Sequence, residues 1–204
     1  MAGRAGGDVP QLGAILVAAL IVGAFLLLAS PVNATNFSGA TGLTGCYDNN
    51  KADSAAHGFF YVSMSPRNAS ATDWARTYVL DPTDVNTYSD SNTSTTDVLV
   101  HDGYYSTLCG FTWFNPASSP GGVVGLAVCG SLSGTACEQF RVYYNQYFTD
   151  IANLSDVRGL ATHEAGHTLG LLHRTGNTAM QTGYPKPCLC FDPNHDVLHL
   201  NSSY

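Results

Sequence analysis

The pattern of hydrophobic positions begins with one long apolar run at residues 12–30. The run contains no charged side chain and follows a short segment that carries Arg4. A basic segment, an apolar run and small residues at its end are the pattern of a secretory signal peptide, here cleaved after Ala34. The run has 19 residues, which is close to the length that spans a bilayer, so an uncleaved membrane anchor is the alternative. We predict that residues 1–34 are a signal peptide and that residues 35–204 form one domain outside the cytoplasm.

Short hydrophobic runs follow, separated by Gly, Pro, Asn and Ser, and these runs indicate strands. The expected strands are residues 58–64, 97–105, 123–129 and 139–148. Residues 72–80 fit either a short helix or a strand, whereas the Asp-, Ser- and Thr-rich residues 81–96 are predicted to be a loop. The polar residues 35–57 are predicted to be irregular.

The pattern becomes helical where Ser155 and Asp156 open the stretch SDVRGLATHEAGHTLG. Ser155 is the expected N-cap. Gly170 is the expected end of the helix, because glycine tolerates the left-handed conformation in which many helices terminate. The chain after Gly170 is rich in Gly, Pro and Cys, and we expect loops there until a short amphipathic segment at residues 195–204.

The composition narrows the class of protein. Of the 204 residues, 45% are hydrophobic and 11% are charged, which suits one packed domain and argues against disorder. The net charge is −7 and the only lysines are Lys51 and Lys186, so no basic stripe is available for nucleic acid or for an anionic membrane surface. We therefore expect no nucleic-acid partner, and contact with a membrane only if the N-terminal segment stays uncleaved.

All six cysteines lie beyond residue 34, and an even number in an oxidising compartment predicts three disulfides. Cys129 and Cys137 flank the segment GSLSGTA and are expected to close a hairpin between two strands. The other four cysteines have three possible pairings, and the sequence does not choose between them: Cys46, Cys109, Cys188 and Cys190. The Cys-Leu-Cys spacing at 188–190 is too tight for an internal bridge without strain. Coordination of a metal by Cys46, as a latency switch, is the alternative to its pairing.

The stretch HEAGHTLGLLH places three histidines, one glutamate and one glycine in a spacing that composition alone would produce with a probability of roughly 8 in a million. On a helix, His163 and His167 lie one turn apart on the same face, where both can bind one Zn²⁺ at about 2.0–2.1 Å. Glu164 is rotated by about 100° from His163 and can lean over the site without being a ligand. Gly170 ends the helix and allows His173 to return as a third ligand. Three protein ligands leave a fourth position for water, as in catalytic zinc sites.

This motif, followed after seven residues by Met180, resembles the metzincin clan of zinc endopeptidases, and the chain is similar to small secreted bacterial matrixin-like proteases. The resemblance implies an α+β fold, with a mixed twisted sheet and the active-site helix in one subdomain and a smaller, irregular C-terminal subdomain from Gly170. It implies that Met180 forms an apolar floor beneath the histidines. It also implies that residues 123–129 are the edge strand above the cleft and that residues 195–204 form a closing helix.

The chain departs from the clan's pattern near the motif. Arg174 stands directly after His173, at a position that differs between families of the clan. Thr182 stands where some families carry a tyrosine, and Tyr184 is close to that position but out of register. Tyr184 is therefore the candidate that helps zinc to hold the oxyanion.

Some matrixins also hold a structural calcium or a second zinc ion. The candidate ligands here are His101, Asp102, Asp81, Asp84 and Asp90. The alternative is that these aspartates accept hydrogen bonds from backbone amides, as aspartates in turns commonly do.

The predicted function is that of a secreted, monomeric zinc-dependent endopeptidase that hydrolyses extended polypeptide. Zinc polarises the scissile carbonyl and activates water, and Glu164 takes the proton of that water and passes it to the leaving amine. The substrate adds as a strand to the edge at residues 123–129. The alternative is a zinc-binding cell-surface interaction module without turnover, and the presence of Glu164 argues against it.

Overall fold

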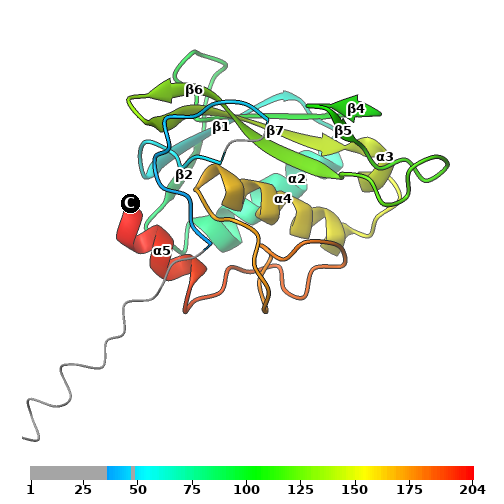
Figure 1. Cartoon of the computed structure of the whole chain (residues 1–204). Helices are drawn as coiled ribbons and strands as arrows, with labels where there is room; N and C mark the ends of the chain where they lie inside the picture. The colour runs from blue at the N-terminus through cyan, green and yellow to red at the C-terminus, as the bar shows by residue number, and fades with distance from the viewer. Residues whose placement is uncertain (1–35, 47–48) are drawn as a thin grey trace, which may run out of the picture. The chain divides into compact units, whose positions relative to one another are not determined.

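A computed structural model describes residues 36–46 and 49–204 of the chain (Figure 1). The predicted signal peptide, residues 1–34, lies outside the described residues. No described helix combines the length and the apolar character needed to cross a bilayer.

The described chain contains a five-stranded mixed sheet with strand order β2-β1-β3-β7-β6. Its strands are β1 (Ala56–Ser63), β2 (Asn86–Ser89), β3 (Val98–Gly103), β6 (Gly125–Ser133) and β7 (Ala136–Asn145). Neighbours are parallel from β2 to β7, and β6 runs antiparallel to β7 at the edge. The mixed sheet with its packed helices is compatible with the predicted α+β class, and the hydrophobic run at 123–129 supplies the start of the edge strand.

Two helices cover one face of this sheet in Figure 1: α2 (Pro66–Ala75), which continues as the π-helical turn η1 (Arg76–Leu80), and α4 (Leu154–Thr168). The short elements are β4 (Thr107–Leu108) paired with β5 (Phe111–Thr112), α3 (Gln146–Thr149) and the last helix, α5 (Asp196–Ser203). The core lies between the sheet and α2 and α4, which also pack on each other. Its fully buried side chains include Val98, Val100, Val142, Leu160 and Ala161.

Helix α4 starts earlier than predicted. Its N-cap is Asn153, whose side-chain oxygen accepts a hydrogen bond from the backbone N–H of Asp156 at 2.9 Å. The Asn153 amide in turn donates to the Asp156 carboxylate at 2.8 Å. The prediction of Ser155 as N-cap was wrong, because this reciprocal pair sets the first turn and leaves Ser155 inside it.

Gly170 ends the helical region as expected, with a φ of +89°. A side chain here would be strained in this left-handed conformation, and its Cβ would lie 2.8 Å from the carbonyl oxygen of Ser38. The backbone N–H of Ser38 donates to the carbonyl oxygen of Gly170 at 2.7 Å. The start of the described chain therefore pairs with the turn that leaves α4.

Two other predictions by composition and pattern were corrected. Residues 81–96 are not one loop, because β2 lies within them and pairs with β1, with the Asp81 carboxylate accepting from the backbone N–H of Thr87 at 3.1 Å. The strand predicted at 139–148 ends at Asn145, whose side chain caps α3. The ambiguous residues 72–80 are helical.

Three disulfides join described cysteines: Cys46–Cys109, Cys129–Cys137 and Cys188–Cys190. The bridge between Cys129 and Cys137 closes the β6–β7 hairpin. Of the three pairings that the sequence left open, the structure has Cys188 joined to Cys190, with Cα atoms 5.2 Å apart, within the span of a disulfide. Cys46 is paired and does not act as a metal ligand here.

Candidate metal centre

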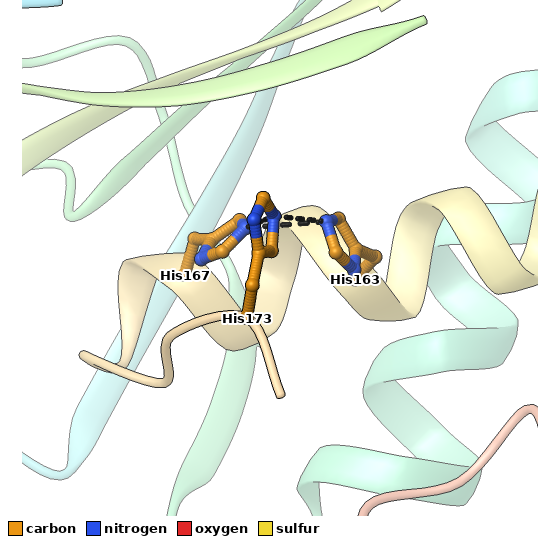
Figure 2. A group of neighbouring side chains, drawn as sticks. All are labelled: His163, His167 and His173. Carbon is orange, nitrogen blue, oxygen red and sulfur yellow. Dashed lines mark hydrogen bonds between the residues drawn. The ribbon is translucent and has the colours of Figure 1, made fainter. Parts of the chain in front are cut away.

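Three histidines converge at the C-terminal half of α4. His163 and His167 project from the helix, and His173 returns from the segment that follows it, so that the three rings point toward one another (Figure 2). Their Nε2 atoms are separated by 3.0 Å between His163 and His173, 3.1 Å between His167 and His173, and 3.2 Å between His163 and His167. About 3.3 Å is the separation expected for nitrogens around a tetrahedral ion at zinc–nitrogen distances.

Backbone carbonyls fix which nitrogen carries the proton on the two helical histidines. His163 Nδ1 lies 2.8 Å from the Ala179 carbonyl oxygen, and His167 Nδ1 lies 2.7 Å from that of Leu171. A carbonyl can only accept, so Nδ1–H donates and each Nε2 keeps a free lone pair. Two lone pairs that face each other at 3.2 Å repel unless a cation lies between them. The donor set therefore fits a bound divalent ion.

Burial keeps these ligands neutral. Loss of solvent lowers the pKa of His167 to about 3, with a further contribution from the charge of His173. Burial likewise holds the pKa of His163 well below its ordinary value. A neutral imidazole is the form that binds a metal ion.

Glu164 is buried beside the histidines and lines the cavity in front of them. Its carboxylate lies against the backbone of β6, since a Cβ at Gly125 would come within 2.5 Å of Glu164 Oε1. Burial raises the pKa of Glu164 to about 8, and the positive charge of Lys186 opposes this rise. A carboxyl group whose pKa is near neutrality is suited to accept and to return a proton.

Met180 is fully buried against the helix that carries the histidines. A Cβ at Gly166 would collide with Met180 Sδ, so the sulfur lies on the α4 backbone between the two helical ligands. The Met180 segment is linked to the residue after His173, because the backbone N–H of Arg174 donates to the Met180 carbonyl at 3.2 Å. The role of Met180 as an apolar floor beneath the histidines stays a prediction.

A buried carboxylate, Asp196, connects the segments that carry the ligands. It accepts a hydrogen bond from Thr178 Oγ1 at 2.5 Å and lies 3.4 Å from Arg174 Nη1. Thr178 Oγ1 in turn accepts from the backbone N–H of Met180 at 3.1 Å. Asp196 thus holds Arg174, which directly follows the ligand His173. Through Thr178 it also holds the loop whose Ala179 carbonyl orients His163.

Tyr184 forms part of the cavity wall, with its ring 4.9 Å from that of Phe148. Its hydroxyl is buried and has no hydrogen-bond partner within the described chain. Burial, and then the charge of Glu164, raise its pKa well above the ordinary value, so the hydroxyl stays protonated. The role of Tyr184 at an oxyanion stays a prediction.

The cavity in front of the histidines has a volume of about 930 Å³. The edge strand β6 with the loop that precedes it lines the cavity, as do residues of the segment from Thr182 to Lys186. Phe111, Phe114 and Phe148 add an aromatic wall. The histidine cluster thus opens onto a large and mainly apolar chamber at a sheet edge.

The candidates for a second metal ion do not come together. Asp81 accepts hydrogen bonds from Thr87, and Asp102 accepts them from the backbone of Ser65 and the side chain of Asn68. Within residues 36–46 and 49–204, the three histidines are the only group of three metal-binding side chains whose ligand atoms are close together.

Sequence reasoning missed three contributors: Lys186, Asp196 and Gly125. Lys186 stands out only as one of two lysines, and Asp196 lies in a segment expected to be amphipathic. Gly125 matters because of its contact with Glu164, which is distant along the chain. None of the three belongs to a local motif, so only the fold reveals them.

A scan with protein-family models finds no match, and no curated protein matches the chain. Among solved structures, two of myroilysin are similar, each with 16% identity and a TM-score of 0.34. The alignments cover 72% and 77% of this chain and 57% and 69% of the two myroilysin chains, respectively. The chain thus spans little more than half the length of the first of these. This likeness is remote.

Proposed function

We propose that the chain is a zinc-dependent endopeptidase that acts outside the cytoplasm as a monomer. The observation that carries the proposal is the convergence of three histidine Nε2 atoms, two of them with their tautomer fixed by a carbonyl, next to a buried glutamate at a cavity. A closed structural site would use a fourth protein ligand, whereas these three leave room for a water molecule. The three disulfides suit an oxidising compartment.

The substrate backbone is proposed to pair with the free edge of β6. Just before β6, Val123 forms a β-bridge with Trp113. Within β6, Cys129 forms a β-bridge with Gly45. Between these two bridges, within the described chain, Gly125–Val128 pair with β7 alone. The first three of these residues line the cavity, so an extended peptide that adds here lies beside the histidines.

A bound zinc ion would supply Lewis acidity for the scissile carbonyl and for a water molecule. Glu164 accepts a proton from the attacking water as its oxygen bonds to the carbonyl carbon. The same carboxyl group returns the proton to the amide nitrogen as the carbon–nitrogen bond breaks, so water is added across the peptide bond.

The test compares wild type, Glu164→Ala and Glu138→Ala at equal zinc content on an unfolded protein substrate. Glu138 is the only other glutamate and lies on β7, so its variant is the matched control. We expect Glu164→Ala to keep its zinc and to lose hydrolysis by about 10²- to 10⁴-fold. A chelator should abolish wild-type hydrolysis, and alanine at any of the three histidines should remove most of the zinc.

Equal rates in wild type and Glu164→Ala would remove Glu164 from the mechanism. No hydrolysis by either protein when fully loaded with zinc would favour the alternative, a zinc-binding surface module without turnover. A purified domain that takes up no zinc at neutral pH would refute both.

A further inference from the structure

Lys186 is the only lysine or arginine among the described residues that line the cavity. Its aliphatic stem lies on α4, because a Cβ at Gly159 would come within 2.9 Å of Lys186 Cγ. The absence of a side chain at Gly159 lets this stem cross the helix, and the ammonium group is thereby fixed next to the metal centre.

The partners of this ammonium group are neutral. Lys186 Nζ donates to the Gln181 carbonyl and lies 4.4 Å from the centroid of the Tyr184 ring. It also lies 3.1 Å from His163 Nδ1, but that atom already donates to the Ala179 carbonyl and has no lone pair left to accept with. Of the three N–H groups, only the one that donates to the Gln181 carbonyl has an acceptor among the described residues.

No carboxylate belonging to residues 36–46 or 49–204 lies within 4 Å of this nitrogen. A half-buried ammonium group without a counter-ion is unfavourable, since burial removes water that would otherwise solvate the charge. Glu164 acts on it electrostatically from a longer distance. In the proposed function the Glu164 carboxylate transfers protons and does not serve as the counter-ion of Lys186. The ammonium group of Lys186 therefore lacks an anionic partner.

We propose that Lys186 is a specificity-determining residue that receives a carboxylate of the substrate, next to the scissile bond. This inference rests on the proposed function and adds a substrate class to it: polypeptides with Asp or Glu at that position, or with a C-terminal carboxylate there. Both sources supply the same planar anion to the free N–H groups of Lys186. The aromatic wall of Phe114, Phe148 and Tyr184 excludes water around the pair and strengthens it.

The experiment uses peptide series that differ at one position on either side of the scissile bond, with Glu, Gln or Lys there. Values of kcat/KM are measured at equal zinc content for wild type, Lys186→Met, Lys186→Arg and Lys51→Met. Lys51 is the matched control, because its ammonium also has a carbonyl and a tyrosine ring as partners, Ser203 and Tyr204, but lies outside the cavity.

Wild type should prefer Glu over Gln on the order of 10- to 100-fold at one of the two positions, as for a hydrogen bond between charged groups. The preference should vanish in Lys186→Met and persist in Lys186→Arg and Lys51→Met. Peptides with a free or amidated C-terminus distinguish the two sources of the carboxylate. A wild type without preference for any carboxylate, or a preference that survives in Lys186→Met, would overturn the proposal.

A binding measurement separates this inference from the proposed function. The affinities of the Glu and Gln peptides for zinc-loaded Glu164→Gln are compared by fluorescence anisotropy, which requires no turnover. A Glu/Gln ratio near 1 overturns the role of Lys186 even if the protein hydrolyses peptides. A clear preference in binding, together with no hydrolysis by wild type, supports Lys186 and refutes the endopeptidase. If Lys186→Met fails to fold, the Glu/Gln affinity ratios of wild type and of Lys186→Arg still test the proposal: a ratio near 1 in wild type overturns it.

Discussion

The half of the candidate site on α4 and the half on the segment after Gly170 are built in different ways. His163, Glu164 and His167 belong to one helix, which Asn153 caps and which packs on the sheet and on α2. The other half has no regular structure until α5 begins. Its ligand is held by contacts with distant segments, among them the hydrogen bond from the Asn36 amide to the carbonyl of His173.

The half of the site on α4 is therefore determined by local sequence, whereas the half after Gly170 depends on contacts throughout the fold. Helical spacing alone places two nitrogens on one face, whatever surrounds them. The position of the third depends on Asp196 and on the start of the described chain. Substitutions that are distant in sequence from the histidine motif should therefore change metal binding mainly through the position of His173.

The largest expected effect comes from removal of the Asp196 carboxylate. Asp196→Ala leaves Arg174 and Thr178 without their buried partner, and we expect the free energy of unfolding to fall by about 3–5 kcal/mol. Zinc affinity should also fall, because both ties to the ligand segment are lost. Urea unfolding and competition with a chelator measure the two effects. Asp192→Ala is the control, because that partner of Arg174 is more exposed. Unchanged zinc affinity in Asp196→Ala would contradict the role of this carboxylate in holding the ligand segment.

The second prediction concerns pH and tests the half on α4. His57 is fully buried and its Nε2 lies 2.8 Å from Thr168 Oγ1 in the last turn of α4, while its Nδ1 has no partner within the described chain. Burial, and then the charge of Arg76, lower its pKa to about 3. The unfolded chain binds a proton below its ordinary pKa of 6.5 and the folded chain does not, so stability is complete above pH 6.5 and falls as the pH drops toward 3.

Between pH 7.5 and pH 5 this group alone should remove about 2 kcal/mol from the free energy of unfolding. The pKa of Asp196 is lowered below its ordinary value by its hydrogen bonds, in spite of burial, so its contribution is lost only at more acidic pH. Chemical denaturation across this range, with His57→Gln as control, measures the effect. A variant that keeps the full pH dependence would show that His57 is not its source.

The third prediction tests the contact between the two halves. In Gly166→Ala the new methyl group collides with Met180 Sδ and comes within 3.0 Å of Phe191. Overpacking should exceed the gain in helix propensity and destabilise the protein by about 1–2 kcal/mol. The matched comparison is Gly159→Ala on the same helix, where the new methyl group would meet Lys186 Cγ at 2.9 Å and Leu189 Cδ2 at 3.2 Å and not the Met180 sulfur. Thermal unfolding compares the two variants, and a Gly166→Ala protein as stable as wild type would argue against tight packing there.

The smallest effect is expected for the bridge between Cys188 and Cys190. A bridge that closes so short a loop constrains the unfolded chain little, so its removal should cost at most about 1.5 kcal/mol. The corresponding value for Cys129–Cys137, which are eight residues apart, is about 2.5 kcal/mol. Serine pairs at each bridge allow the comparison by urea unfolding. A larger loss at Cys188–Cys190 would mean that this bridge fixes the segment in the folded state as well.

The contrast between locally encoded and fold-dependent parts also explains which features could be predicted from the sequence. Helix α4, its end at Gly170, the hairpin at Cys129 and Cys137 and a strand at residues 123–129 follow from patterns within a few residues. Strand β2 was missed because its pairing with β1, not its composition, makes it a strand. Lys186 and the pairing within residues 188–190 were missed for a similar reason, since tertiary contacts determine both.

Chain synthesis delivers the parts of this centre in a fixed order. Helix α4 emerges first with two nitrogens already on one face, and the loop with Thr178 follows. Asp196, in the last described helix, emerges after both, and until then Arg174 and Thr178 lack the carboxylate that ties them together. A nascent chain therefore holds two ligands in place before the third is fixed. We therefore expect the centre to reach its full affinity for a metal only when α5 has docked, and the proposed hydrolysis to begin only at the end of folding.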